Sequence, residues 1–355
     1  MRRVLFVDDD ANVLAGLERM LRPYRHSWTT FTAIDGETAL QVLATTEVDV
    51  IVSDMRMPRM DGAELLTRVR ENHPEVVRIV LSGQMDGSAS LRTASVAHQF
   101  LSKPCSTEAL IEVIQRSCDL RSASYSHSLR RALGHIGSLP SPGTTIVELN
   151  RVMASGDVDL DEVGAIVSKD PAITAKVLQL VNSAFFGLPH SVADIRMAIT
   201  YLGVMTVRNL FVASDVFRAF DGSGTLKRKD VETLQARAVV VASTAADLSA
   251  GTSEREWAFL AGLVHDIGIL ALACCPAEVI GDSDHLGGGF DVVSRIEAAV
   301  GAGHADVGAY LLTMWGLPDI VVDAVARHHT EDPDIELSAV AAAVRDAVRA
   351  VEGEG

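Results

Sequence analysis

The side chains best suited to chemistry are acids, a serine and a lysine at the ends of short apolar runs. Asp8 and Asp9 follow the first run, Asp54 the third and Lys103 the fifth, while Ser82 ends the fourth. Carboxylates are ligands that Mg²⁺ prefers, and a lysine and a hydroxyl can contact two phosphoryl oxygens. Phosphoryl transfer depends mostly on positioning and charge neutralisation. These residue types therefore predict that an aspartate accepts a phosphoryl group beside Mg²⁺.

A second group of such side chains lies in the last third of the chain. His265 and Asp266 are adjacent in an apolar segment, and His304, His328 and His329 follow. Imidazole and carboxylate donors suit Zn²⁺, Fe or Mn²⁺. A buried acid without a partner is costly, so a metal or a histidine hydrogen bond must satisfy Asp266. We favour a hydrogen-bonded polar cluster that organises the helices, with a metal site as the alternative.

Alternating strand and helix signals in residues 1–120 would bring the first group together. Strands are expected at Arg3–Val7, Trp28–Ala33, Val48–Ser53, Val76–Ser82 and His98–Leu101. Helices are expected at Ala11–Leu21, Glu37–Leu43, Ala63–Arg70 and from Ser106 or Thr107 to about Leu120. This alternation predicts an α/β fold, a doubly wound five-stranded parallel sheet. The carboxyl ends of its strands meet in one crevice.

The strand signal nearly disappears after residue 120, which predicts an all-helical second part. Residues 121–135 are expected to form a helical connector, and residues 136–350 a domain with bundles at 136–225 and 230–350. Helical spacing is found at Ile146–Met153, Leu160–Val167, Ile173–Asn182, Ser191–Leu202 and Thr206–Phe220. Later helices are expected at 231–250, 254–274, 290–299, 304–315, 318–329 and 335–351, with a glycine-rich loop at Asp282–Gly289.

Charge and composition exclude several classes of protein. The net charge is −16, of which residues 1–121 carry −3 and the remainder −13. An acidic second half repels a phosphate backbone, so direct DNA binding is not expected. The apolar stretch Trp257–Ile280 contains His265 and Asp266, which favours a helix buried in protein over a membrane span. With no signal peptide and four cysteines that form no C-x-x-C pair, we expect a cytoplasmic protein with buried thiols.

Four motifs in the first part resemble the receiver domain of two-component response regulators. They are Phe6–Asp10, Ile51–Gly62, Val80–Gly83 and Phe100–Pro104. The resemblance implies that a histidine kinase or phosphotransfer protein phosphorylates Asp54. It implies Mg²⁺ bound by Asp9, Asp54 and the backbone carbonyl of Arg56, with Asp8 acting through water. It also implies phosphoryl contacts from Lys103 and Ser82, a conformational switch at Phe100, a cis peptide bond at Lys103–Pro104, and homodimerisation.

The second part resembles the HDOD domain, a helical output module related to HD phosphohydrolases. The motifs are Leu139–Gly143, Ser168–Gly187, Ala198–Gly203, Gly262–Gly268, His304–Leu312, Trp315–Pro318 and His328-His329. Next to these we expect Phe185 and Phe186, beside Asn182, to be core residues, and Trp315 to be a core anchor.

Two departures from the HD enzymes argue against catalysis. Arg237 stands where they have a metal-binding histidine, and Ile269 stands where some carry a lysine. Asp346 is a candidate for the last acidic ligand. We therefore expect an output domain that signals by binding a downstream protein. The alternatives are a metal-dependent phosphohydrolase acting on a nucleotide or cyclic dinucleotide, and a sensor that binds a metal or nucleotide.

Overall fold

A computed structural model gives the fold of the chain in two compact units. The structure describes residues 2–82, 96–122, 127–136, 148–149, 151–152, 159–182, 188, 190–203, 207, 228–275, 294, 297–298, 300–332 and 334–353. One unit comprises residues 1–137 with 183–189, and the other comprises residues 138–182 with 190–355.

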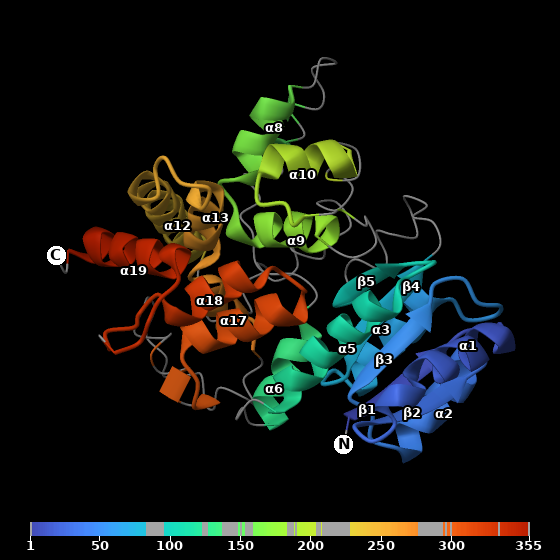
Figure 1. The fold of residues 1–355 in the computed structure, drawn as a ribbon. Coiled ribbons are helices and arrows are strands. Elements are labelled where there is room, and N and C mark those ends of the chain that lie inside the picture. Colours follow the sequence, from blue (N-terminus) through green and yellow to red (C-terminus); the bar gives the residue numbers. More distant parts are fainter. Residues whose placement is uncertain are drawn as a thin grey trace. The chain divides into compact units, whose positions relative to one another are not determined.

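The first unit is a parallel sheet with the strand order β2-β1-β3-β4-β5 (Figure 1). The strands are β1 (Arg2–Val7), β2 (Trp28–Ala33), β3 (Val50–Asp54), β4 (Val77–Ser82) and β5 (Gln99–Ser102). The described helices are α1 (Ala11–Leu21), η1 (Arg22–Tyr24), α2 (Gly36–Thr45), α3 (Gly62–Asn72), α5 (Thr107–Ser122) and α6 (His127–His135). The predicted doubly wound α/β fold is confirmed.

The core of this unit follows from the two-residue period of its strands. Val4 and Phe6 of β1 pack in one cluster with Leu17 of α1 and Ile114 of α5. The intervening Leu5 is also fully buried, so the sheet is covered on both faces. The chain adds β2 on one side of β1 and then crosses back to add β3 on the other side. This change in the direction of strand addition places α2 and α3 on the face of the sheet opposite α1.

All regular secondary structure described in the second unit is helical. Its helices are α8 (Leu160–Val167), α9 (Pro171–Val181), α10 (Ile195–Leu202), α12 (Arg228–Leu248), α13 (Arg255–Val264), α14 (Ile267–Ala273), α17 (His304–Met314), α18 (Asp319–Arg327) and α19 (Ala339–Glu352). Asp159 and Asp170 cap α8 and α9, and Pro171 occupies the first position of α9. Trp315 is 2% exposed, which confirms its place in the core.

Two predicted helices of this unit differ from the observed ones. The helix expected at 191–202 begins four residues late, because the Asp194 side chain accepts hydrogen bonds from the main chain of Arg196 and Met197 and caps α10 there. The helix expected at 254–274 is broken at His265 and Asp266 into α13 and α14.

Other predictions fall where the structure describes few or no residues. Those lying wholly or almost wholly outside the described residues are Phe185, Phe186, the helix at 206–220 and the loop at 282–289. Of the helices expected at 146–153 and 290–299, only scattered positions are described. Asn182 is described, and its amide pairs with the main chain of Val192 on both sides, at 2.6 and 2.8 Å.

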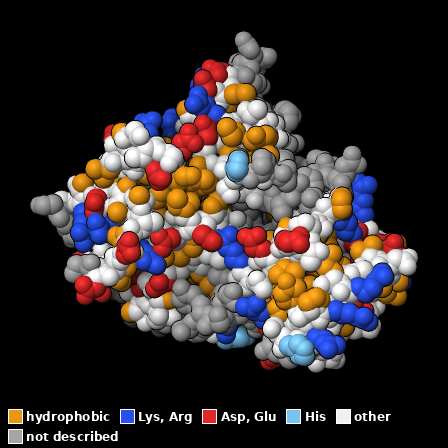
Figure 2. Space-filling model, viewed as in Figure 1, with side chains coloured by type: hydrophobic (Ala, Val, Ile, Leu, Met, Phe, Trp, Pro, Cys, Tyr) orange, Lys and Arg blue, Asp and Glu red, His pale blue; other side chains and the backbone are white. Residues whose placement is uncertain are grey.

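Among the described residues, the segment Arg255–Ala273 is long and apolar enough to cross a membrane. Its mean hydropathy is 1.5, and 78% of it is buried inside the fold. It therefore serves as a core segment of the second unit. On the face shown in Figure 2, Lys and Arg side chains lie interspersed with Asp and Glu.

Candidate functional site

The first candidate site lies at the carboxyl edge of the sheet. Asp54 is the last residue of β3, Ser82 is the last of β4, and Asp8 directly follows β1. Lys103 directly follows β5. Parallel pairing in register brings these ends together, since Asp54 lies opposite Leu81 of β4.

Lys103 links two carboxylates at this edge. Its Nζ lies 2.6 Å from Oδ2 of Asp8 and 2.5 Å from Oδ1 of Asp54. The side chains of Asp8 and Asp54 are 4% and 12% exposed. Burial acts to lower the pKa of Lys103, but the hydrogen bonds and charges of Asp54 and Asp8 outweigh it, so the pKa is raised. The ammonium group therefore stays charged beside both acids.

Main-chain donors orient the two carboxylates. The Asp10 N–H donates to Oδ1 of Asp8 at 3.0 Å, and the Arg56 N–H donates to Oδ2 of Asp54 at 3.1 Å. The second contact places Arg56 beside Asp54. Asp9 lies at the same strand end with an exposed side chain. The structure thus brings Asp8, Asp54 and Lys103 into direct contact and leaves Asp9 facing solvent.

The donor set at this edge fits Mg²⁺. Asp8, Asp9 and Asp54 offer carboxylate oxygens, the hard donors that this ion prefers. Among the described residues, Lys103 pairs with Asp8 and Asp54, and a divalent cation would offset further negative charge of these acids and Asp9. Such an ion would be held by these acids and would reduce the repulsion between Asp54 and an incoming phosphoryl group.

Ser82 and Phe100 lie on the neighbouring strands with little exposure, 8% and 4% respectively. Phe100 pairs in register with Val80 of β4, two residues before Ser82. The Lys103–Pro104 peptide bond is cis, as the motif predicts. The residues expected to contact and sense the phosphoryl group therefore share one corner of the sheet.

The second candidate site is a cluster of imidazoles around Asp266. His265 and Asp266 occupy the break between α13 and α14, His304 begins α17, and His328 and His329 follow α18. A Cβ added to Gly268 would lie 1.9 Å from the carbonyl oxygen of His304. The absence of a side chain at Gly268 lets α14 and α17 approach closely enough to bring the five residues together.

Asp266 is the centre of this cluster. Its Oδ2 lies 3.1 Å from Nε2 of His265, and its Oδ1 lies 3.4 Å from Nε2 of His304 and 3.8 Å from Nε2 of His328. Its side chain is 6% exposed, and neither carboxylate oxygen has a partner of hydrogen-bond geometry among the described residues. These are charge contacts rather than well-formed hydrogen bonds.

Three of the rings are held by their outer nitrogens. Nδ1 of His265 lies 2.7 Å from the carbonyl oxygen of Gly262, and Nδ1 of His328 lies 2.7 Å from that of Val325. Nδ1 of His304 lies 2.6 Å from Oε1 of Glu297. Because these oxygens only accept, each Nδ1 carries a proton and each Nε2 faces the cluster. This arrangement is typical of histidines that bind a metal.

The ligand atoms of His304, His328 and His329 lie within 4.8 Å of one another. Together with the unsatisfied carboxylate of Asp266, this donor set fits a divalent cation that prefers nitrogen ligands. Such an ion would be held by the histidines and Asp266.

The charges of the cluster favour a hydrogen-bonded arrangement. Burial acts to lower the pKa of His304, but Asp266 and Glu297 outweigh it and raise that pKa. Burial and repulsion from His265 lower the pKa of His328 well below its ordinary value, and burial also lowers that of His329. Nε2 of His304 lies 3.1 Å from Nε2 of His329 and 3.3 Å from Nε2 of His328, so a proton on this nitrogen can be donated to one of the two neighbours.

Arg237 stands next to the cluster. Its Nε lies 3.5 Å from Oδ2 of Asp266, and its Nη2 donates to Glu352 of α19 at 2.5 Å. Burial acts to raise the pKa of Asp266, but His265, His304 and Arg237 hold it well below 3.8. Asp346, the candidate for the last acidic ligand, has a half-exposed carboxylate that pairs with Arg345 at 2.8 Å.

Glu297 and Glu352 are site residues that sequence reasoning missed. Glu297 lies outside the motifs, and Glu352 lies at the end of the last helix. The spacing of the motifs therefore pointed to neither residue.

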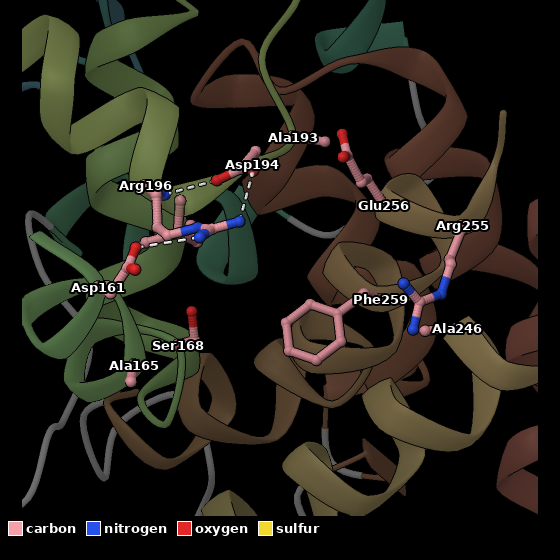
Figure 3. Close-up of a pocket in the computed structure, with 12 residues that line it drawn as sticks. Asp161, Ala165, Ser168, Ala193, Asp194, Arg196, Ala246, Arg255, Glu256 and Phe259 are labelled. Atoms are coloured by element: carbon pink, nitrogen blue, oxygen red, sulfur yellow. Dashed lines mark hydrogen bonds and ion pairs between the residues drawn. The ribbon is translucent and has the colours of Figure 1, made fainter.

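A cavity of about 510 Å³ lies elsewhere in the second unit, between α8, α10, α12 and α13 (Figure 3). Arg196 on its wall donates to Asp161 at 3.0 Å and lies 3.9 Å from Asp194. Phe259 and Arg255 come from the opposite wall. The histidines and Asp266 do not line this cavity, so it is separate from the cluster.

Both parts of the chain match known protein families. Residues 4–115 match the response regulator receiver domain, and residues 139–331 match the HDOD domain. The second match alone covers more than half of the chain. The chain belongs to the response regulators that carry an HDOD domain.

This HDOD response regulator has several curated relatives. An uncharacterised protein of Treponema pallidum is 24% identical over 55% of this chain and 38% of its own length. The DNA-binding transcriptional regulator NtrC of Escherichia coli is 33% identical over 32% of this chain and 24% of its own length. The transcriptional regulatory protein PrrA of Mycobacterium leprae is 31% identical over 54% of this chain and 83% of its own length. The chain thus spans well under half of the first two proteins.

Two solved structures are also similar to this HDOD response regulator. The signal receiver domain of an HD domain-containing protein from Pseudomonas fluorescens Pf-5 is 30% identical, covering 35% of this chain and 98% of its own, with a TM-score of 0.33. The MmoQ response regulator from Methylococcus capsulatus is 23% identical, covering 61% and 85%, with a TM-score of 0.48.

Proposed function

We propose that Asp54 accepts a phosphoryl group from a histidine kinase or phosphotransfer protein, with Mg²⁺ bound at the same edge. The observation that carries this proposal is the contact of Lys103 with both Asp8 and Asp54. In this arrangement Asp54 supplies the attacking carboxylate oxygen, and Lys103 neutralises a phosphoryl oxygen as the bond to phosphorus forms. Ser82 donates to another phosphoryl oxygen, and Phe100 changes position in response.

A variant at the acceptor tests this assignment. Purified wild-type chain incubated with acetyl phosphate and Mg²⁺ should gain one phosphoryl group, and Asp54→Asn should gain none, because an amide cannot form the acyl phosphate. Asp61→Asn is the matched control, since Asp61 caps α3 nearby and asparagine caps equally well. Intact mass spectrometry gives the readout. Equal phosphorylation of Asp54→Asn and wild type would refute the site.

We further propose that the HDOD domain signals by binding a downstream protein and does not hydrolyse a substrate. The support is Arg237, whose guanidinium already supplies a cation beside Asp266. Bringing a divalent metal to the same carboxylate would place two cations close together in a buried setting, which is unfavourable. The net charge of −13 beyond residue 121 supports an output other than DNA binding. We expect the protein to act in the cytoplasm as a homodimer.

A second candidate function, a metal-dependent phosphohydrolase or metal sensor, is favoured by one observation. His304, His328 and His329 gather their ligand atoms at one point. A bound divalent metal would supply an acidic water there, and the histidines with Asp266 would hold it.

Metal affinity separates the two candidates. We expect calorimetry to give no tight Mn²⁺ or Zn²⁺ binding at the cluster in wild type and at least tenfold tighter binding in Arg237→His, which replaces a cation by a ligand. Arg255→His, on an exposed arginine of the same unit, is the control. Turnover of a cyclic dinucleotide by wild type, lost in Asp266→Ala, would contradict the binding-only output.

A further inference from the structure

The connector helix α6 is packed onto the receiver and belongs to the same unit as the sheet. Leu129 and Leu133 are fully buried, and Ile136 just beyond the helix is 5% exposed. Arg131 pairs with Glu75, in the turn before β4, at 3.2 Å. The helix therefore buries an apolar face, and it contacts α3 and the turn before β4, at the amino end of the sheet and opposite the phosphorylation edge.

The strongest polar contact to α6 comes from Arg78 of β4. The guanidinium is fully buried, and four carbonyl oxygens accept hydrogen bonds from its N–H groups. These acceptors are the carbonyl oxygens of Val96, Pro74, Val76 and Gly134, at 2.7 to 3.2 Å. His98 lies beside them: its Nδ1 accepts from the main-chain N–H of Arg78 at 3.1 Å, and its Nε2 lies 2.7 Å from Nη2. One buried charge thus joins the turn before β4, the segment before β5 and the last turn of α6.

Two features show that this contact depends on close approach. A Cβ added to Gly134 would lie 1.9 Å from the carbonyl oxygen of Pro74, so only glycine fits at this point of α6. The acceptor on Gly134 is a last-turn carbonyl, where a helix has unpaired oxygens and partial negative charge. Burial and repulsion from Arg70 lower the pKa of Arg78 to about 9, so the guanidinium remains charged at neutral pH.

Arg78 also lies in line with the residues expected to sense phosphorylation. Ile79 and Leu81 of β4 pack on the α1 and α5 face, so Arg78 and Ser82 point to the opposite face. Phe100 of β5 shares that face, because it pairs with Val80, and His98 just before β5 contacts Arg78 directly. A movement of β4 or β5 at the phosphorylation edge is therefore carried along rigid strands to the guanidinium.

We propose that Arg78 holds the connector helix α6 on the receiver through its hydrogen bonds, a contact that we call the clamp. In this proposal phosphorylation changes the strength of the contact and so repositions the attachment of the output domain. The second half rests on the proposed phosphorylation of Asp54. The clamp itself rests on the contacts of Arg78 and Gly134.

Hydrogen exchange of the full chain, followed by mass spectrometry, tests the clamp. In Arg78→Met, α6 should exchange roughly tenfold faster than in wild type, because a buried charged donor is lost. Gly134→Ala should have the same effect while keeping the guanidinium, and it covers the case in which Arg78→Met fails to fold. Arg131→Gln is the control, since it removes only a partly exposed ion pair, and it should change exchange less than about threefold.

Protection of α1, on the opposite face, should be unchanged in a folded variant. If α6 exchanges at the wild-type rate in both Arg78→Met and Gly134→Ala, the clamp is overturned.

The regulatory half is tested on wild-type chain treated with acetyl phosphate and Mg²⁺, with phosphorylation verified by intact mass. Exchange in α6 should change on phosphorylation in wild type and should not respond in Gly134→Ala. If hydrogen exchange of α6 is unchanged in protein whose phosphorylation has been verified, the regulatory half is overturned and the clamp is not. A chain that takes no phosphoryl group would overturn the proposed function and this half together, whereas the clamp is still decided by the two variants.

Discussion

At the scale of single residues, the receiver site holds two carboxylates in contact with the ammonium group of one lysine. Lys103 touches both Asp8 and Asp54, and these carboxylates have little access to solvent. Replacing the lysine leaves two buried acids facing each other, which is costly unless another cation takes its place. Lys103 is therefore a structural counter-ion, and in the proposed reaction it also contacts the phosphoryl group.

The variant Lys103→Met tests that dual role. We expect it to lose about 1–3 kcal/mol of stability, because charged hydrogen bonds to two carboxylates are removed. Mg²⁺ should restore more stability to this variant than it adds to wild type, since the ion supplies the missing charge. Thermal unfolding with and without Mg²⁺ measures both effects, with Lys103→Arg as the control that keeps the charge. An identical Mg²⁺ response in wild type and Lys103→Met would contradict this account.

The histidine cluster predicts an optimum in stability near pH 6.5. His304 has a raised pKa, so its contribution is present below 6.5 and is lost as the pH rises through its folded-state value. His328 and His329 have lowered pKa values, so their contribution is present above 6.5 and is lost as the pH falls. The stability of the second unit should therefore decline as the pH is raised above 6.5 and as it is lowered below 6.5.

Chemical unfolding between pH 5 and 8.5, with a chelator present, measures this profile. His304→Gln should flatten the alkaline decline, and His328→Gln should flatten the acidic one. A wild-type profile that is monotonic over this range, or one that neither variant alters, would argue against the charge assignment.

At the scale of elements, helix caps decide where the output helices begin. Asp170 is fully buried and accepts hydrogen bonds from the main chain of Ala172 and Ile173, whereas Asp159 caps α8 at the surface. Asp170→Ala should cost about 2 kcal/mol and Asp159→Ala about 1 kcal/mol or less. Urea unfolding of the full chain compares them. Equal losses would show that burial of the cap adds nothing.

The elements also show what local sequence can and cannot predict. The receiver strands were placed to within about two residues because their apolar runs are short and bounded by acids and turns. The break at His265 and Asp266 was not predicted, since the apolar spacing continues through it. The close approach of Gly268 to His304, two residues beyond the break, is a tertiary contact that local periodicity does not contain.

At the scale of the whole molecule, the chain joins a receiver to a helical HDOD unit. The spacing of motifs predicted both halves, because the strand ends of a parallel sheet and the histidine motifs each have strong local patterns. The partners Glu297 and Glu352 could not be found in that way, because their roles depend on how distant segments pack around His304 and Arg237. The same holds for the clamp between Arg78 and Gly134, which are 56 residues apart.

The central claim is that one aspartate, Asp54, carries the phosphoryl group in the full-length protein. Reduction of the phosphorylated chain with borohydride converts an aspartyl phosphate into homoserine, and peptide mapping then locates it. We predict homoserine at position 54 alone. Homoserine at position 8 or 9, or at any other aspartate in place of 54, would contradict the account.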